Sequence, residues 1–217
     1  MRRFQRPLYS RCYARLSEKA EIRGVSALRD QLLYGLSGQV VEVGAGNGLN
    51  FAHYPADVGE VLAVEPDDFL RERARRVVES ASVPVRFVSA DANDLPLPDA
   101  SRDAAVVSLV LCTVQDPNRV VAEIRRVLRP GGELRFYEHV RHPSPRMALV
   151  QDAVTPLWQR VFGGCHPNRD LEQVIASGGF EITDLARFFL APSRFDPTAP
   201  HLLGRALRRP SEENRPS

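Results

Sequence analysis

The amino-acid sequence predicts an α/β fold built around a mostly parallel sheet. Short apolar runs rich in β-branched residues alternate along the chain with longer helix-like segments. The first run ends in glycines at three alternate positions, Gly44, Gly46 and Gly48. A strand, a glycine-rich turn and a following helix are typical of a nucleotide-binding loop in such a sheet. The length of 217 residues suits one α/β domain with a sizeable core.

Three parts of the chain differ in composition. Residues 1–38 are polar and arginine-rich, and we expect them to form a helical prelude or lid. Residues 39–207 carry the alternating pattern and form the predicted ligand-binding domain. Residues 208–217 are charged and are expected to form a flexible tail.

The predicted strands are short apolar segments bounded by turn residues. Ala104–Ser108 is a continuous apolar run of the kind that is buried on both faces of a sheet. The turn signal Arg129-Pro130-Gly131-Gly132 precedes a further strand. The expected strands are Gln39–Val43, Val61–Glu65, Val85–Ser89, Ala104–Ser108 and Glu133–Glu138, with further candidates at Phe180–Leu185 and His201–Leu207.

The predicted helices lie between these strands. Asp116 and Pro117 are the start signals of one helix, and Asp67 or Asp68 suits the start of another. The expected helices are Leu49–Tyr54, Asp68 to about Ser80, Asn118–Leu128, Arg146–Phe162 and Arg169–Ser177.

Composition and charge argue against several classes of protein. The formal net charge of +2 gives no argument for nucleic-acid binding. No apolar run approaches the length needed to span a bilayer, and residues 1–7 lack the apolar core of a signal peptide. Cys12, Cys112 and Cys165 are odd in number and far apart, without metal-ligand spacing. We therefore expect reduced cytoplasmic thiols and no metal site.

The glycine loop departs from the dinucleotide pattern. G-x-G-x-x-G would place a third glycine where Leu49 stands, which weakens the case for a pyrophosphate ligand. The acid Glu42, just before the loop, suits a ligand that carries a positive charge. Glu65 ends the next strand about 20 residues after the turn, where a ribose-binding acid is expected. The alternatives are a bare tight βα turn and a capping or surface acid.

These features resemble the class I S-adenosylmethionine-dependent methyltransferases, whose first motif is an apolar strand, an acid and G-x-G-x-G. The resemblance implies a Rossmann-like, seven-stranded, mostly parallel sheet with helices on both faces. It also implies S-adenosyl-L-methionine as the cofactor and S-adenosyl-L-homocysteine as the product. Asp91, after the third strand, matches the family's acid near the adenine amine. The implied cofactor-binding residues are Glu42, Gly44, Ala45, Gly46, Asn47, Gly48, Glu65, Pro66, Asp91, Ala92, Ser108 and Leu109.

A narrower resemblance, over roughly residues 40–207, is to the human thiol methyltransferases formerly called methyltransferase-like 7 proteins. It implies transfer of a methyl group to a small-molecule acceptor, a thiol in that group. The shared features are Asn50-Phe51, Tyr54-Pro55, Leu109–Cys112, the Leu-Arg-Pro-Gly-Gly run 128–132, Glu138-His139-Val140, Trp158, Gly164-Cys165, and Pro200-His201 with Gly204.

The amino-terminal segment departs from that group, whose human members begin with an apolar membrane anchor. Its arginines alternate with aromatic residues, so the membrane association of the group is not carried over. We weigh a basic lid over the active site, transient contact with an anionic membrane, and a solvated helix that packs its aromatic residues on the domain. The residues concerned are Arg2, Arg3, Arg6, Arg11, Arg15, Phe4, Tyr9 and Tyr13.

Methyl transfer from a sulfonium is a displacement reaction, so the protein mainly aligns the nucleophile and excludes water. The ends of the fourth and fifth strands should face the methyl group. We therefore expect His139 as a base or orienting group, with Glu138 beside it, and a packed histidine is the alternative. His201 is a further candidate base. The predicted substrate-pocket residues are Tyr9, Tyr13, Cys112, Trp158 and His166, with a core role as the alternative for Cys112 and the aromatic residues.

Two classes of function stay open at this point. The first is a methyltransferase that acts on a small thiol, or alternatively on a nitrogen, oxygen or carbon atom of a lipid, quinone or secondary metabolite. The second is a catalytically inactive cofactor-binding or scaffold protein. The expected partners are a small-molecule acceptor and no nucleic acid, with no membrane span and peripheral contact open. The chain is expected to be a monomer or a homodimer.

Overall fold

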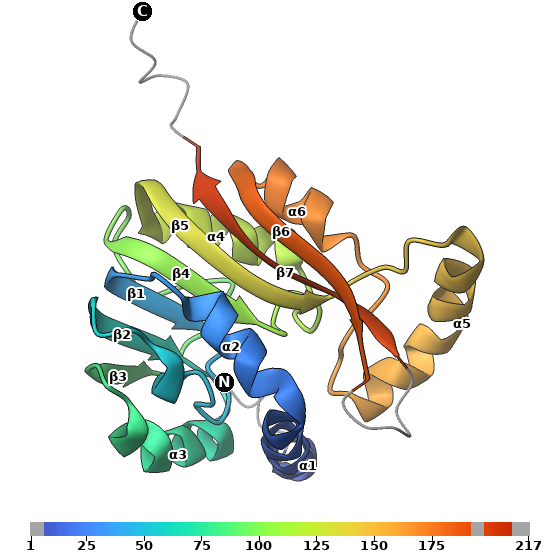
Figure 1. Cartoon of the computed structure of the whole chain (residues 1–217), viewed down its shortest axis with the longest axis horizontal. Coiled ribbons are helices and arrows are strands. Elements are labelled where there is room, and N and C mark those ends of the chain that lie inside the picture. The colour runs from blue at the N-terminus through green and yellow to red at the C-terminus, as the bar shows by residue number, and fades with distance from the viewer. Residues whose placement is uncertain (1–6, 192–197, 210–217) are drawn as a thin grey trace, which may run out of the picture.

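The computed structural model describes residues 7–191 and 198–209. Its sheet has seven strands in the order β3-β2-β1-β4-β5-β7-β6 (Figure 1). The first five strands in this order are parallel, and β7 runs antiparallel to both of its neighbours. This confirms the predicted α/β, Rossmann-like, mostly parallel sheet. The strands are β1 Gly38–Val43, β2 Val58–Val64, β3 Val85–Val88, β4 Arg102–Ser108, β5 Leu128–His139, β6 Phe180–Leu190 and β7 Ala199–Arg208.

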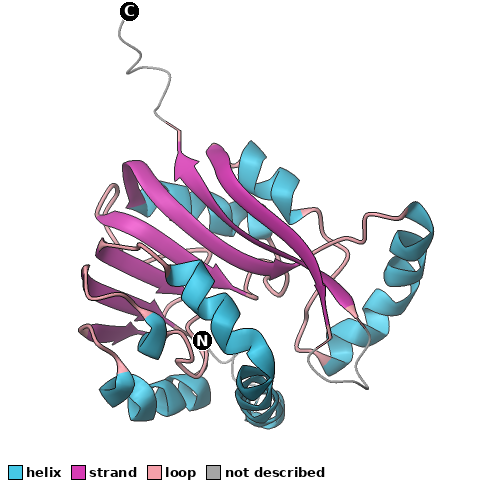
Figure 2. Ribbon diagram, in the orientation of Figure 1, coloured by secondary structure: helices cyan, strands magenta, loops and turns pink. Residues whose placement is uncertain are grey.

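Helices cover both faces of the sheet, with α2 in front and α4 and α6 behind in the view of Figure 2. Three of them begin at an aspartate whose side chain accepts a hydrogen bond from a backbone N–H in the first turn: Asp67 for α3, Asp116 for α4 and Asp170 for α6. The helices are α1 Pro7–Ala20, α2 Ser26–Leu33, α3 Asp68–Val77, α4 Pro117–Val127, α5 Pro145–Val161 and α6 Leu171–Ser177, with a π-helical turn at Glu21–Val25 and 3-10 turns at Phe51–His53 and Val78–Ser80.

The sheet separates two hydrophobic cores. Alternate residues of a strand point to opposite faces, so Val41 and Val43 of β1 pack with α4 and α6, whereas Val40 packs with α2. Leu32 and Leu33 of α2 are 1% and 0% exposed. The segment before β1 is therefore part of the core on one face.

The structure corrects the predicted helix at Leu49–Tyr54, because only the 3-10 turn Phe51–His53 forms there. The predicted turn at 129–132 lies inside β5, which begins at Leu128. Arg102 pairs with Leu128 and Ala104 with Glu133, so the register shifts there and Gly131, with a φ of +76°, turns the backbone within β5. The two candidate strands at the carboxyl end both form, and each is longer than predicted.

Helix α5 lies at the edge of the molecule (Figure 1) and exposes an apolar surface. Its most exposed large side chains are Leu149 and Leu157, at 68% and 65%. Among the described residues, no helix combines the length and apolar character needed to cross a membrane.

Candidate functional site

The glycine loop lies at the carboxyl ends of β1 and β2. The N–H groups of Gly44 and Ala45 both donate to the carbonyl of Val64, at 2.8 and 3.1 Å. Gly44 has a φ of +71°, and a Cβ atom there would lie 2.6 Å from Cγ2 of Val110. Gly48 has a φ of +82°, and its Cβ would lie 2.7 Å from the ring of Phe51. Backbone conformation and close packing therefore both require glycine in this loop.

Glu65 directly follows β2 and faces the glycine loop. One carboxylate oxygen accepts a bond from the N–H of Gly46 at 2.9 Å, and the other accepts from the N–H of Asp67 at 2.8 Å. The residue is 6% exposed, and burial raises the pKa of its carboxyl to about 7. The predicted ribose acid is thus held at the loop by two backbone donors.

Asp91 follows β3 and is half-buried. Its Oδ1 accepts bonds from the backbone and the side chain of Asn93, at 3.0 and 2.7 Å. The hydroxyl of Ser89, two residues earlier, is buried and has no hydrogen-bond partner among the described residues. Glycine backbone, the Glu65 carboxylate and this polar end of β3 fit a ligand that carries ribose and adenine, as S-adenosylmethionine does.

Glu42 lies in a buried chain of hydrogen bonds that leads to the amino-terminal helices. Its carboxylate accepts bonds from Asn50 at 2.7 Å and from the Tyr54 hydroxyl at 2.9 Å. Asn50 in turn accepts from Arg29 at 2.6 Å, and Arg29 pairs with Glu21 at 2.9 Å. Burial raises the pKa of Glu42 to about 7. The expected contact of Glu42 with a positively charged ligand stays a prediction, since its oxygens are bonded within the protein.

Sequence reasoning did not assign Arg29 to this site. Its position in a polar helix gives no signal of burial, although it is 7% exposed. The sequence marked Asn50 and Tyr54 only as residues shared with the thiol methyltransferases and predicted no role for either. Their acceptor, Glu42, sits on a strand, and only the fold brings the three together.

Glu138, at the end of β5, holds the loop that follows β4. Its carboxylate accepts bonds from the N–H groups of Val110, Leu111 and Cys112, at 2.9, 2.9 and 3.0 Å. The residue is fully buried, and burial raises the pKa of its carboxyl. Leu109 enters this loop with a φ of +58°, a strained value for a residue with a side chain. Glu138 therefore stabilises a strained loop beside the glycine loop.

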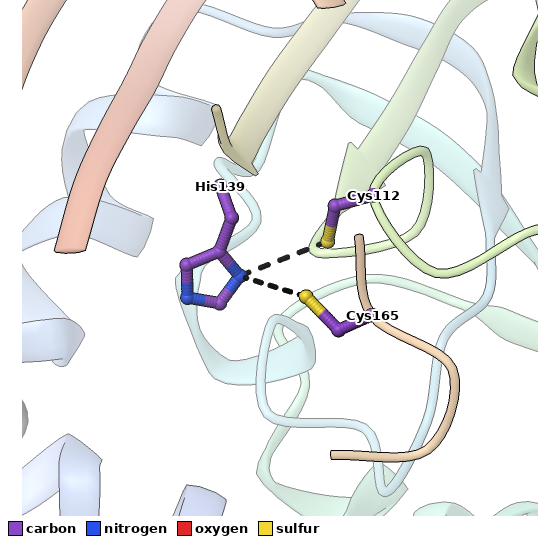
Figure 3. A group of neighbouring side chains, drawn as sticks. All are labelled: Cys112, His139 and Cys165. Atoms are coloured by element: carbon purple, nitrogen blue, oxygen red, sulfur yellow. Dashed lines mark hydrogen bonds between the residues drawn. The ribbon is translucent and has the colours of Figure 1, made fainter. Parts of the chain in front are cut away.

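One ring nitrogen of His139 faces two cysteines from different parts of the chain (Figure 3). Its Nδ1 is 3.7 Å from Sγ of Cys112 and 3.6 Å from Sγ of Cys165. The pKa of Cys165 is lowered to about 5, first by a hydrogen bond from Cys112 and also by His139, whereas burial raises that of Cys112. The ring of His201 lies 4.4 Å from that of His139, and burial lowers the pKa of His201 to about 3.

The predicted pocket residues of α1 contact both loops of the site. The ring of Tyr13 lies against Gly46, and the ring of Tyr9 lies against Gly163, two residues before Cys165. The two tyrosine rings stack at 6.0 Å. Helix α1 therefore packs against both the glycine loop and the loop that contains Gly163 and Cys165.

The two other predicted pocket residues flank Cys165. Trp158 stacks on Phe162 at 4.1 Å, and its buried ring N–H contributes to the lowered pKa of Cys165. The backbone N–H of His166 donates to the carbonyl of Cys112 at 2.6 Å. A separate cleft of about 280 Å³ lies beyond β5 and is lined partly by His201.

Comparisons with known proteins agree with this arrangement. A family model described as a methyltransferase domain matches residues 41–136. The Thiol S-methyltransferase TMT1B of Rattus norvegicus is 35% identical over 208 residues, which cover 93% of this chain and 83% of that protein. The Thiol S-methyltransferase TMT1A of Homo sapiens is 32% identical over 180 residues, which cover 80% of this chain and 73% of that protein.

A solved S-adenosylmethionine-dependent methyltransferase from Thermotoga maritima has the same fold. It superimposes with a TM-score of 0.67 at 24% identity, over 91% of this chain and 94% of that one.

Proposed function

The chain belongs to the family of S-adenosylmethionine-dependent methyltransferases that includes the thiol S-methyltransferases TMT1A and TMT1B, and from this membership we propose that it methylates the sulfur atom of a small thiol. S-adenosyl-L-methionine is the cofactor. The observation that carries the acceptor is the 35% identity over 93% of this chain to a thiol S-methyltransferase. The match extends beyond residues 41–136 into the segment that contains Trp158 and Cys165.

The cofactor site proposed here combines backbone and carboxylate contacts. Glu65 would accept hydrogen bonds from the ribose hydroxyls, and Asp91 would contact the adenine amine. The loop from Gly44 to Gly48 would pass close to the rest of the cofactor. When bound, the cofactor supplies a methyl group that its sulfonium already activates.

The protein's own part in the reaction is to position the acceptor and exclude water. A thiol has a pKa of about 8.5, so a modest change of environment produces the thiolate nucleophile. Glu138 would act as a positioning residue, because its carboxylate is used by three backbone donors. Helix α1 would close the site, because Tyr13 packs on the glycine loop.

An acceptor panel tests this function. Purified protein is incubated with S-adenosylmethionine and either a small alkyl thiol, a phenol or an amine, and release of S-adenosylhomocysteine is measured. We expect turnover with the thiol at a rate well above that with the other two. Turnover of the phenol or the amine without turnover of the thiol would refute S-methylation. No turnover and no cofactor binding by calorimetry would instead support an inactive protein.

The proposed setting is a reducing compartment such as the cytoplasm. Cys112 and Cys165 are free thiols close to one another, and an oxidising compartment would favour their pairing. The proposed partner is a small molecule, and the chain acts as a monomer or a homodimer. Light scattering during gel filtration distinguishes these two states.

A further inference from the structure

The cluster of Cys112, His139 and Cys165 has the composition of a metal site. The fold brings together the loop after β4, the end of β5 and the loop after α5. The three ligand atoms, two Sγ and one Nδ1, all lie within 4.8 Å of one another (Figure 3). The cysteines are 1% and 4% exposed. A buried group of this kind differs from the exposed acidic clusters that are common on protein surfaces.

The distances fit tetrahedral coordination. A zinc ion binds cysteine sulfur at about 2.3 Å and histidine nitrogen at about 2.0–2.1 Å. At tetrahedral angles these bond lengths separate a sulfur from a nitrogen by about 3.6 Å. The two sulfur–nitrogen distances here are 3.7 and 3.6 Å. Both sulfur–nitrogen distances therefore match those expected for one tetrahedral ion.

The ligand chemistry selects a particular class of metal. Two sulfurs and an imidazole favour zinc and similar soft divalent ions, whereas magnesium and calcium prefer oxygen ligands. Three protein ligands leave a fourth tetrahedral position open, as in catalytic zinc sites rather than in closed structural ones. His166 adjoins Cys165 but lies outside the group of mutually close ligand atoms.

We propose that Cys112, His139 and Cys165 bind one zinc-type divalent cation whose fourth position accepts the sulfur of the thiol substrate. The role in substrate binding rests on the proposed thiol methylation, whereas the metal site itself does not. The acceptor R–SH displaces a metal-bound water and releases its proton to solvent. The sulfur then forms a bond to the methyl carbon as the carbon–sulfonium bond breaks, which gives R–S–CH₃ and S-adenosylhomocysteine. Water then replaces the neutral thioether on the metal.

The position of the cluster suits this role. Val110, two residues before Cys112, packs against Gly44 of the glycine loop. Tyr9 and Tyr13 of one helix contact Gly163 beside Cys165 and Gly46 of the glycine loop. The cluster and the glycine loop are therefore in contact through the loop after β4, and helix α1 packs against both.

Cobalt binding tests the metal site. The full-length chain without a histidine tag is stripped of metal under reducing conditions and titrated with Co²⁺, which reports thiolate ligands by a charge-transfer band and tetrahedral geometry by intense visible bands. We expect one equivalent to bind with both signals. Zn²⁺ affinity, measured by competition with a chromophoric chelator, should fall by at least about 100-fold in Cys165→Ser and in His139→Ala. Cys12→Ser, at an exposed cysteine outside the cluster, should match the parent.

S-adenosylhomocysteine binding by each variant confirms that the fold is intact. Equal metal affinity in the parent and in folded Cys165→Ser would overturn the site.

Measurements of thiol turnover with and without metal test the substrate role of the metal separately from the proposed S-methylation. We expect that addition of the thiol changes the visible cobalt bands and that metal-free protein loses thiol turnover, which Zn²⁺ restores. Equal turnover with and without metal would overturn the substrate role. Metal bound by the cluster together with turnover of a different acceptor would refute S-methylation and leave the metal site standing.

Discussion

At the scale of single residues, the site depends on three buried carboxyl groups. Glu42, Glu65 and Glu138 are 2%, 6% and 0% exposed, and each accepts at least two hydrogen bonds. Burial raises the pKa of all three. Each acid joins a strand end to a loop or turn, so we expect a change at any of them to affect the proposed cofactor site.

Replacement of Glu65 by alanine should weaken cofactor binding. It removes the acceptor for the ribose hydroxyls, and a hydrogen bond to a charged group is worth about 1.5–3 kcal/mol. Calorimetric titration with S-adenosylhomocysteine measures the change. Glu181→Ala, at an exposed acid on β6, is the control and should bind like the parent. Unchanged affinity in Glu65→Ala would show that another residue binds the ribose.

Glu42 should make the stability of the protein depend on pH. Its pKa rises from 4.5 to about 7 on folding, so the folded state holds a proton more tightly than the unfolded state. This contribution is fully present below pH 4.5 and is lost as the pH rises through about 7. Its size is about 3–4 kcal/mol. Urea unfolding of Glu42→Gln should show a flatter decline over this window than the parent or Glu181→Gln does. An identical pH dependence would mean that Glu42 stays ionised throughout.

At the scale of secondary-structure elements, short polar signals fix where the helices begin. The side chain of Asp116 accepts a bond from the N–H of Arg119 and so caps α4, which packs in the core behind the sheet. Loss of such a cap costs about 0.5–2 kcal/mol. Asp116→Ala should lower the free energy of unfolding by this amount, and Asp116→Asn, which keeps an acceptor, should lower it by less. Chemical denaturation of both variants compares them. Equal stability of the two variants would mean that the cap does not stabilise α4.

Local patterns predicted most elements, because caps and apolar runs act over a few residues. The signal at Asp116 and Pro117 located α4, and the glycine spacing located the tight turn after β1. The helix expected at Leu49–Tyr54 failed, because Asn50 and Tyr54 bond to Glu42 on β1 and only a 3-10 turn remains between them.

The metal-ligand cluster could not be seen in the sequence. Cys112 and His139 are separated by 27 positions, and His139 and Cys165 by 26, so no compact spacing marks them. Their approach depends on the pairing of β4 with β5 and on the return of the chain after α5. The expectation of no metal site came from spacing along the chain, and only three-dimensional proximity bears on the question.

At the scale of the whole molecule, α1 packs against both the glycine loop and the loop that contains Cys165. The second contact depends on Gly163, which leaves space for the ring of Tyr9. A Cβ on Gly163 would lie 1.9 Å from the ring of Tyr9, so Gly163→Ala should displace α1. Gly131→Ala is a matched control, since Gly131 also has a positive φ but nothing within 4 Å of its Cβ position. Hydrogen exchange should become faster in residues 9–17 of Gly163→Ala and stay unchanged there in the control. Slow exchange in both variants would show that α1 docks without Tyr9.

The buried chain from Glu21 through Arg29 and Asn50 to Glu42 has a consequence for dissecting the protein. A fragment that began at residue 39 would lack Arg29 and would leave the Asn50–Glu42 pair without its cation. It would also expose the core face that Leu32 and Leu33 cover. Residue 38 marks the point where the amino-terminal helices give way to β1, but we do not expect it to be a domain boundary. We therefore expect that a fragment beginning at residue 39 would not fold stably by itself, because these buried contacts of Arg29, Leu32 and Leu33 would be missing.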